Sequence, residues 1–76
     1  MEDLLQILKG INDTVDFESQ TAIIDDGIID SIDLTGLISE LEDTFNIEID
    51  MDEIVAENFN TVDAMWEMIT RLQSDN

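Results

Sequence analysis

The sequence lacks cysteine, histidine and proline, and Lys9 and Arg71 are its only cationic side chains. Without cysteine, the chain can form no disulfide and offers no thiolate to a zinc ion. Without histidine as well, it lacks the nucleophile and base pairs of Ser-His and Cys-His hydrolases. Its three glycines, Gly10, Gly27 and Gly36, lie far apart, so a glycine-rich phosphate-binding loop is also excluded.

Long apolar runs are missing too. The first residues, Met1 to Leu5, carry no positive side chain, and the apolar run there is too short for a signal peptide. No stretch approaches the roughly 20 apolar residues that a membrane-spanning helix needs. We therefore expect a cytoplasmic chain without membrane insertion, and its 76 residues predict a single domain over residues 1–76.

Positive charge is scarce, since 20 acidic side chains stand against two basic ones and the formal net charge is −18 at pH 7. Most carboxylates have no cationic side chain to pair with, and they repel one another. Nucleic acids and anionic membranes require positive charge on a protein, so the composition disfavours both as ligands. A basic protein surface is the partner that this charge favours, although high solubility alone or a salt-rich habitat would explain the same composition.

Apolar residues make up 43% of the chain and recur at helical spacing. A first stripe predicts a short helix that ends near Gly10 to Asn12, and it consists of Leu4, Leu5, Leu8 and Ile11. A long connection over residues 13–30 follows, which we expect to pack onto the helices through its own apolar residues: Val15, Phe17, Ile23, Ile24, Ile28 and Ile29. The isoleucine pairs leave short strands as an alternative.

The clearest predicted helix comes after this connection. Its apolar residues fall at positions i, i+3, i+4, i+7 and i+11 of one helix face: Leu34, Leu37, Ile38, Leu41 and Phe45. Asp30 is a favourable N-cap, and Asp33 suits the positive end of the helix dipole. Gly36 in the helix interior is unfavourable by up to about 1 kcal/mol relative to alanine.

Two more helices complete the prediction. Asp50 and Glu53 indicate an acid-capped start of a short third helix, about Met51 to Glu57, which ends at the breaker Asn58 to Asn60. Thr61 caps a last helix whose apolar stripe is Val62, Met65, Trp66, Ile69 and Leu72. The predicted fold class is all-α: a small four-helix bundle with a long loop between helices 1 and 2 and a short helix 3.

Carboxylates are the one catalytic group present in quantity. A pair of them would suit glycoside hydrolysis by residue type, but a bundle of this size offers little cleft for a sugar. Residues 48–59 place acids at alternate positions, as a calcium-binding EF-hand loop does. Glu53 stands where that loop needs glycine, however, and Phe59 where it needs glutamate. We therefore expect neither an enzyme nor a metal site of this kind, while loose binding of divalent cations to the acidic surface stays open.

Ser31 is the remaining candidate for chemistry. It directly follows Asp30, at the predicted start of the second helix. The unpaired N–H groups and the positive dipole of a helix N-terminus favour a phosphodiester attached there, whereas Asp30 and Asp33 oppose it. A plain capping role, which is common for serine, explains the residue by its position alone.

A resemblance to a known protein family favours a modified serine over a plain helix cap. The segment Gly27 to Leu34 (GIIDSIDL) resembles the phosphopantetheine attachment motif of acyl and peptidyl carrier proteins, in which Asp-Ser is followed by an apolar residue. Residues 45–49 (FNIEI) resemble the family's connection after its second helix. Residues 51–64 are similar to its short third helix and to the threonine and valine at the start of its last helix. The similarity covers about Ile24 to Leu72, and the first helix matches only in kind.

The resemblance implies a non-catalytic carrier. We expect it to be monomeric and, since the sequence begins with Met1 and ends soon after the last predicted helix, free-standing, with a piece of a larger synthase as the alternative. By this resemblance, a phosphopantetheinyl transferase attaches 4′-phosphopantetheine covalently to Ser31, and the group holds acyl or aminoacyl cargo as a thioester. It also implies that the second helix docks on basic surfaces of loading and transfer enzymes through Asp30, Ile32, Asp33, Glu40, Glu42 and Asp43. Ten of the 20 acids lie between Asp30 and Glu57, which favours steering toward this face. A merely solvated helix face is the alternative for Glu40, Glu42 and Asp43.

Departures from the family pattern bear on the pathway. Many fatty-acid carriers have glutamate five residues after the serine and an apolar residue eight after it, where this chain has Gly36 and Ser39. The run Asp26 to Ile29 is more similar to stand-alone or D-alanyl-type carriers. Fatty-acid, polyketide, nonribosomal-peptide and D-alanyl transfer pathways all stay open. The alternative function is an acidic helical interaction module that binds a basic protein partner.

Overall fold

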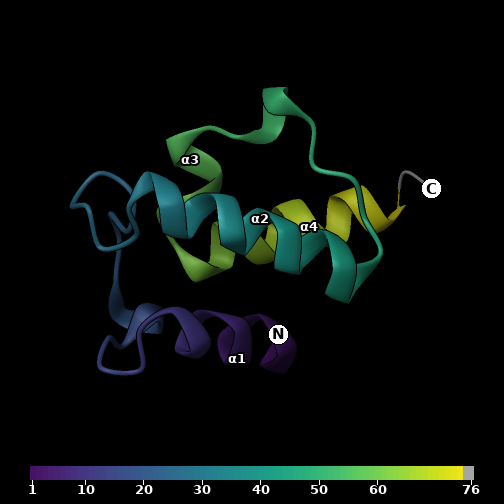
Figure 1. The fold of residues 1–76 in the computed structure, drawn as a ribbon. Helices are drawn as coiled ribbons and strands as arrows, with labels where there is room; N and C mark the ends of the chain where they lie inside the picture. Colours follow the sequence, from purple (N-terminus) through teal and green to yellow (C-terminus); the bar gives the residue numbers. More distant parts are fainter. Residues whose placement is uncertain (75–76) are drawn as a thin grey trace.

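The structure is a computed structural model that describes residues 1–74, and all regular structure within them is helical. Four α-helices follow one another: α1 (Glu2–Ile11), α2 (Ser31–Phe45), α3 (Ala56–Phe59) and α4 (Val62–Ser74). Short 3-10 helices lie at Phe17–Ser19 (η1) and Met51–Glu53 (η2). In Figure 1, α1 and α2 run side by side in opposite directions, and α4 packs against α2 as well. The predicted all-α fold with four helices and a long first loop is confirmed, and residues 1–74 contain no strand.

The first helix ends where the sequence predicts. Leu4 and Leu8, one helical turn apart on the same face, are fully buried in the core. After Ile11 the chain leaves the helix at Asn12, which is extended and whose N–H still donates to the Leu8 carbonyl at 3.1 Å. Leu4 and Leu8 therefore fix one face of α1 against the rest of the bundle.

The predicted N-cap of the second helix is confirmed. Asp30 has an extended backbone, and its Oδ1 accepts a hydrogen bond from the Asp33 N–H at 2.8 Å, which satisfies one open amide of the first turn. Asn46 ends the helix in the left-handed conformation, with φ 54°, as asparagine often does. Leu37 and Leu41 are the buried residues of this helix.

The long connection between α1 and α2 packs onto the core, as predicted. Phe17, Ile23 and Ile29 are buried in it, and Val15, Ile24 and Ile28 are partly buried against it. Gly27 turns the chain with φ +71°, a left-handed conformation that glycine adopts at little cost. Strands at the isoleucine pairs, the alternative prediction, are wrong because this segment forms turns instead.

One side chain ties this connection to the far end of the sequence. The Oδ1 atom of Asn60 accepts hydrogen bonds from the N–H groups of Ile24 at 2.9 Å and of Asp25 at 3.1 Å. The Asn60 Nδ2 donates to the Asp25 carboxylate, and the Asn60 carbonyl accepts from the Ile23 N–H. Hydrogen bonds to the junction between α3 and α4 therefore determine the path of this loop. We call these four bonds the Asn60 clasp.

The predicted third helix over residues 51–57 is wrong in its extent. The segment contains η2 and the start of α3, separated by two residues outside any helix. Asp50 makes no side-chain capping bond, and the Glu53 carboxylate, expected to complete the cap, accepts two hydrogen bonds from Arg71 instead. Asn58 and Phe59, predicted as part of a helix breaker, lie inside α3, where Phe59 is buried. The predicted short third helix exists, but it starts later and ends later.

The last helix begins as predicted, because the Thr61 hydroxyl accepts a hydrogen bond from the Ala64 N–H at 3.0 Å. Its buried face includes Met68, which the predicted stripe omits. Phe45 of α2 meets Trp66 of α4 edge to face, with ring centroids 5.8 Å apart. Within residues 1–74, no helix is both long enough and apolar enough to cross a membrane.

Candidate functional site

Ser31 is the first residue of α2, and its side chain is exposed. The capping hydrogen bond to the first turn comes from its neighbour Asp30. The Ser31 carbonyl accepts from the Thr35 hydroxyl at 2.9 Å, but the Ser31 hydroxyl itself bonds to no group in residues 1–74. Asp30 therefore fills the capping role that sequence position alone allowed for Ser31, and the serine oxygen is open to a modifying enzyme.

The loop before Ser31 is held firmly. Ile29, two residues upstream, is 2% exposed and anchors the start of the helix in the core. The Ile23 carbonyl accepts hydrogen bonds from the N–H groups of Ile28 at 3.0 Å and Ile29 at 3.3 Å, so the turn around Gly27 closes on itself. Together with the Asn60 clasp at residues 23–25, these contacts fix the conformation of the loop that precedes Ser31. The serine oxygen itself faces solvent.

The surroundings of Ser31 suit a phosphodiester in one respect and oppose it in another. The first amides of α2 have no acceptor within the helix, and the helix dipole is positive at this end. The Asp33 amide is already taken by Asp30, and both carboxylates add negative charge. Because the serine is exposed, a phosphate on its oxygen stays hydrated and screened from these acids. The site thus fits a covalently attached phosphate group on a flexible arm.

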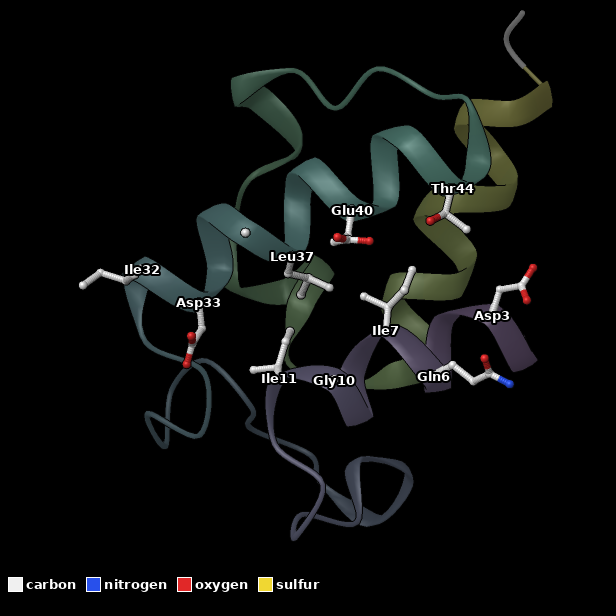
Figure 2. Close-up of a pocket in the computed structure, with 11 residues that line it drawn as sticks. Asp3, Gln6, Ile7, Gly10, Ile11, Ile32, Asp33, Leu37, Glu40 and Thr44 are labelled. Atoms are coloured by element: carbon white, nitrogen blue, oxygen red, sulfur yellow. The ribbon is translucent and has the colours of Figure 1, made fainter.

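Three of the predicted docking residues lie along one groove between α1 and α2. Ile32, Asp33 and Glu40 all line it, as Figure 2 shows. The side chain of Ile32 is 81% exposed, a large fraction for isoleucine. Ile32 and Asp33 therefore lie beside Ser31 at the start of α2, whereas Glu40 lies further along the helix (Figure 2).

The other predicted docking residues lie elsewhere. Asp43 is exposed on α2 but does not line this groove, and Asp30 is engaged in the helix cap. Glu42 is partly buried, and its Oε2 accepts a hydrogen bond from the Ile49 N–H at 3.0 Å. Glu42 therefore supports the chain that leaves α2, whatever it also contributes to docking.

Sequence reasoning missed a second exposed apolar group. Met51 is 86% exposed, and Val55 and Ile54 are 42% and 37% exposed, in the segment assigned to a third helix. This segment carries the chain back from the end of α2 toward its start (Figure 1). The signal was present in the sequence as apolar residues outside any stripe, but only the broken helix reveals that they face solvent. Within residues 1–74, no group of three or more acidic side chains is arranged to hold a metal ion.

Comparison with known proteins identifies the class. Residues 2–69 match the family described as the phosphopantetheine attachment site. The match spans most of the chain, which therefore belongs to this family of carrier proteins. Membership implies a covalently attached 4′-phosphopantetheine cofactor.

Individual relatives point in the same direction. The chain is similar to the D-alanyl carrier proteins of Streptococcus pyogenes serotypes M5 (strain Manfredo), M49 (strain NZ131) and M1, with 37% identity over 51 residues in each case. The match covers 67% of this chain and 65% of the length of each relative. No solved structure matches the chain significantly.

Proposed function

We propose that this chain is a non-catalytic carrier that receives 4′-phosphopantetheine on Ser31, holds an acyl or aminoacyl group on it and delivers that group to partner enzymes. The bound cofactor supplies a thiol, which holds the cargo as a thioester. The observation that carries the proposal is the Ser31 hydroxyl, exposed and unbonded at the first position of α2 within the family match.

The chain's own part in attachment is to supply a nucleophilic oxygen. The Ser31 oxygen forms a bond to the phosphorus next to the pantetheine in coenzyme A, and the bond from that phosphorus to the adenosine phosphate breaks. A base of a phosphopantetheinyl transferase takes the hydroxyl proton. Asp30 keeps the helix start capped throughout, because its hydrogen bond to the Asp33 amide does not involve the serine side chain.

D-alanine is the first cargo to test. The relatives named above are D-alanyl carriers, and the run Asp26 to Ile29 is similar to carriers of that type. Gly36 and Ser39 stand where many fatty-acid carriers have a glutamate and an apolar residue, which argues against a housekeeping role in fatty-acid synthesis. An aminoacyl pathway is thus better supported than a fatty-acid one.

Partner enzymes meet the chain through acidic residues beside the serine. Asp33 lies next to the exposed Ile32, and Glu40 and Asp43 add charge further along α2. Each exposed pair with a partner lysine or arginine contributes little by itself, about 0 to 1 kcal/mol, so the group as a whole steers and orients the partner.

Intact mass measurement after incubation with coenzyme A and a promiscuous phosphopantetheinyl transferase tests the attachment site. The wild type should gain the mass of one arm and Ser31→Ala should gain none. Ser39→Ala, an exposed serine on the same helix, should behave as the wild type. No gain in the wild type would favour the alternative of an acidic interaction module, and a gain in Ser31→Ala would move the site to another residue.

Loading of the modified protein tests the cargo. With ATP and a D-alanine-activating ligase, the protein should gain one alanyl group from D-alanine, and hydroxylamine should remove it because it is a thioester. L-alanine serves as the control and should not load. A protein that gains the arm but never D-alanine remains a carrier for a different cargo.

A further inference from the structure

An open groove with a volume of about 680 Å³ lies between α1 and α2. Ile7 and Ile11 of α1 and Leu37 of α2 form its apolar floor, and Figure 2 shows the two isoleucines pointing from α1 toward α2. On α2 its lining runs from Ile32 to Thr44, which at 1.5 Å per residue is about 18 Å, or three helical turns. A groove of this length between two helices is long enough to receive one side of a third helix.

Two of the residues that line the groove are glycines, which have no side chain. Gly36 of α2 and Gly10 of α1 both line it, and a Cβ atom at either position would meet no heavy atom within 4 Å. Packing of the fold therefore does not require glycine there, although Gly36 destabilises the interior of α2 by about 1 kcal/mol relative to alanine. The absent side chains leave room for an incoming group to approach the helix backbone.

The negative charge around the groove indicates which kind of partner can bind in it. Asp33 lies near one end, Asp3 near the other and Glu40 between them on the α2 side (Figure 2). No lysine or arginine is among the residues of 1–74 that line the groove. A second copy of this chain, with a formal charge of −18, would be repelled, as would nucleic acid or an anionic membrane. The complementary occupant has an apolar ridge and carries cations on both sides of it.

We propose that the α1–α2 groove receives an amphipathic helix of a basic protein partner, with apolar side chains against Ile7 and Ile11 and with lysines or arginines facing Asp3, Asp33 and Glu40. The proposal rests on the proposed function in one respect, because the partner is then an enzyme that loads or unloads the arm on Ser31. It adds α1 to the docking surface, which the sequence confined to α2.

A labelled model peptide tests the groove. The probe is a 15-residue helical peptide with leucines at positions i, i+4, i+7 and i+11 and lysines beside them, and fluorescence anisotropy measures its Kd. A scrambled peptide of the same composition controls for attraction to the acidic protein as a whole, and it should bind more weakly. In ¹⁵N-labelled protein, the largest chemical-shift changes should fall at the groove residues of both helices.

Two matched variants separate the groove from the outer face of α2. Gly36→Leu fills part of the groove. It should raise the Kd of the peptide about tenfold or more, because the leucine side chain would displace part of the peptide's apolar ridge. Its unfolding midpoint should not fall, because leucine is a better helix former than glycine and a Cβ atom at this position meets no heavy atom within 4 Å. Ser39→Leu adds the same bulk to the same helix outside the groove and should bind the peptide as the wild type does.

Equal binding by Gly36→Leu and the wild type would overturn the proposal, as would an equal loss in Ser39→Leu or equal binding of the scrambled peptide. The outcome is independent of the attachment site. Ser31→Ala cannot receive the arm under the proposed function, yet it should bind the peptide normally. Conversely, the mass gained by the wild type with coenzyme A reports on Ser31 whether or not the groove binds a helix.

Discussion

Arg71 of α4 meets Glu53 of η2 in a two-pronged ion pair, with Nη2 2.6 Å from Oε1 and Nη1 3.0 Å from Oε2. These hydrogen bonds, helped by the positive charge of Arg71, lower the pKa of Glu53 below its ordinary value of 4.5. The pair ties the irregular segment after α2 to the last helix. At this position a carboxylate has a purely structural task.

The pH dependence of stability follows from that lowered pKa. Because Glu53 binds its proton less readily in the folded state than in the unfolded state, the ion pair stabilises fully above about pH 4.5 and is lost as the pH falls through the lowered pKa. Urea unfolding at several pH values should therefore show Glu53→Gln less stable than the wild type at pH 6, with the difference shrinking as the pH falls below 4.5 and through the lowered pKa. Glu57→Gln, an exposed neighbour, should show no such difference. A constant difference at all pH values would contradict the role of the pair.

Glu42 gives a second prediction at this scale. Its carboxylate accepts the Ile49 N–H, and Ile49 is buried, so Glu42→Ala should destabilise by about 1 to 3 kcal/mol as the amide loses its acceptor. Glu42→Gln keeps an acceptor oxygen and should cost less. Urea unfolding measures both. If both variants were as stable as the wild type, Glu42 would be a surface acid available for docking alone.

Helices of this chain were predictable where their signals are local. The α2 helix follows from a stripe of apolar residues and from Asp30, whose capping bond reaches only three residues along the chain. The third helix failed because Glu53, read as part of a local cap, instead pairs with Arg71, 18 residues away. The Asn60 clasp spans more than 30 residues and leaves no periodic pattern at all. The position of Ser31 at a helix start was predictable for the same reason that α2 was.

The groove was not predictable, because it depends on how α1 packs beside α2. Its floor residue Ile11 was assigned correctly to a stripe, yet the side of α2 that α1 would cover had no signal in the sequence. Asp33 and Glu40 were selected as docking residues, and their common position on the groove became visible only once the two helices were paired.

Two glycines provide a matched test at the scale of elements. Gly36→Ala should stabilise the protein by up to about 1 kcal/mol, because it removes a poor helix former from α2 without any contact to displace. Gly27→Ala should destabilise by about 1 kcal/mol, because its φ of +71° is strained for any residue with a Cβ. Thermal unfolding measures both shifts. Shifts of the same sign would refute the assignment of these two backbone conformations.

The Asn60 clasp predicts how the first loop depends on the last helix junction. Asn60→Ala removes the acceptor of the Ile24 and Asp25 amides and should cost about 1 to 3 kcal/mol of unfolding free energy. Hydrogen exchange should rise chiefly in residues 23–29, far from the substitution in sequence. Asn58→Ala is the control, since the Asn58 side chain donates only to Glu53 and makes no bond to that loop. Uniform exchange changes across all helices would contradict a local clasp.

The whole molecule carries its charge within a small volume, with extents of 34 × 23 × 21 Å and a formal charge of −18. At about 10 mM salt the Debye length is about 30 Å, so carboxylates on opposite faces still repel, whereas at 0.1 M it falls to about 10 Å. The melting temperature should therefore rise with sodium chloride over this range at pH 7. The rise should shrink near pH 4, where a large fraction of the carboxylates is protonated. A melting temperature that does not change with salt concentration at pH 7 would show that repulsion between carboxylates does not limit stability.

Two neighbouring residues at the start of α2 have different roles. Asp30 caps the helix backbone, and Ser31 has an exposed side-chain oxygen that can be modified. Esterifying that oxygen breaks no intramolecular hydrogen bond of residues 1–74. The bare and the derivatised protein can consequently share one conformation and one resistance to urea, and a transferase need not pull the helix apart to reach its target.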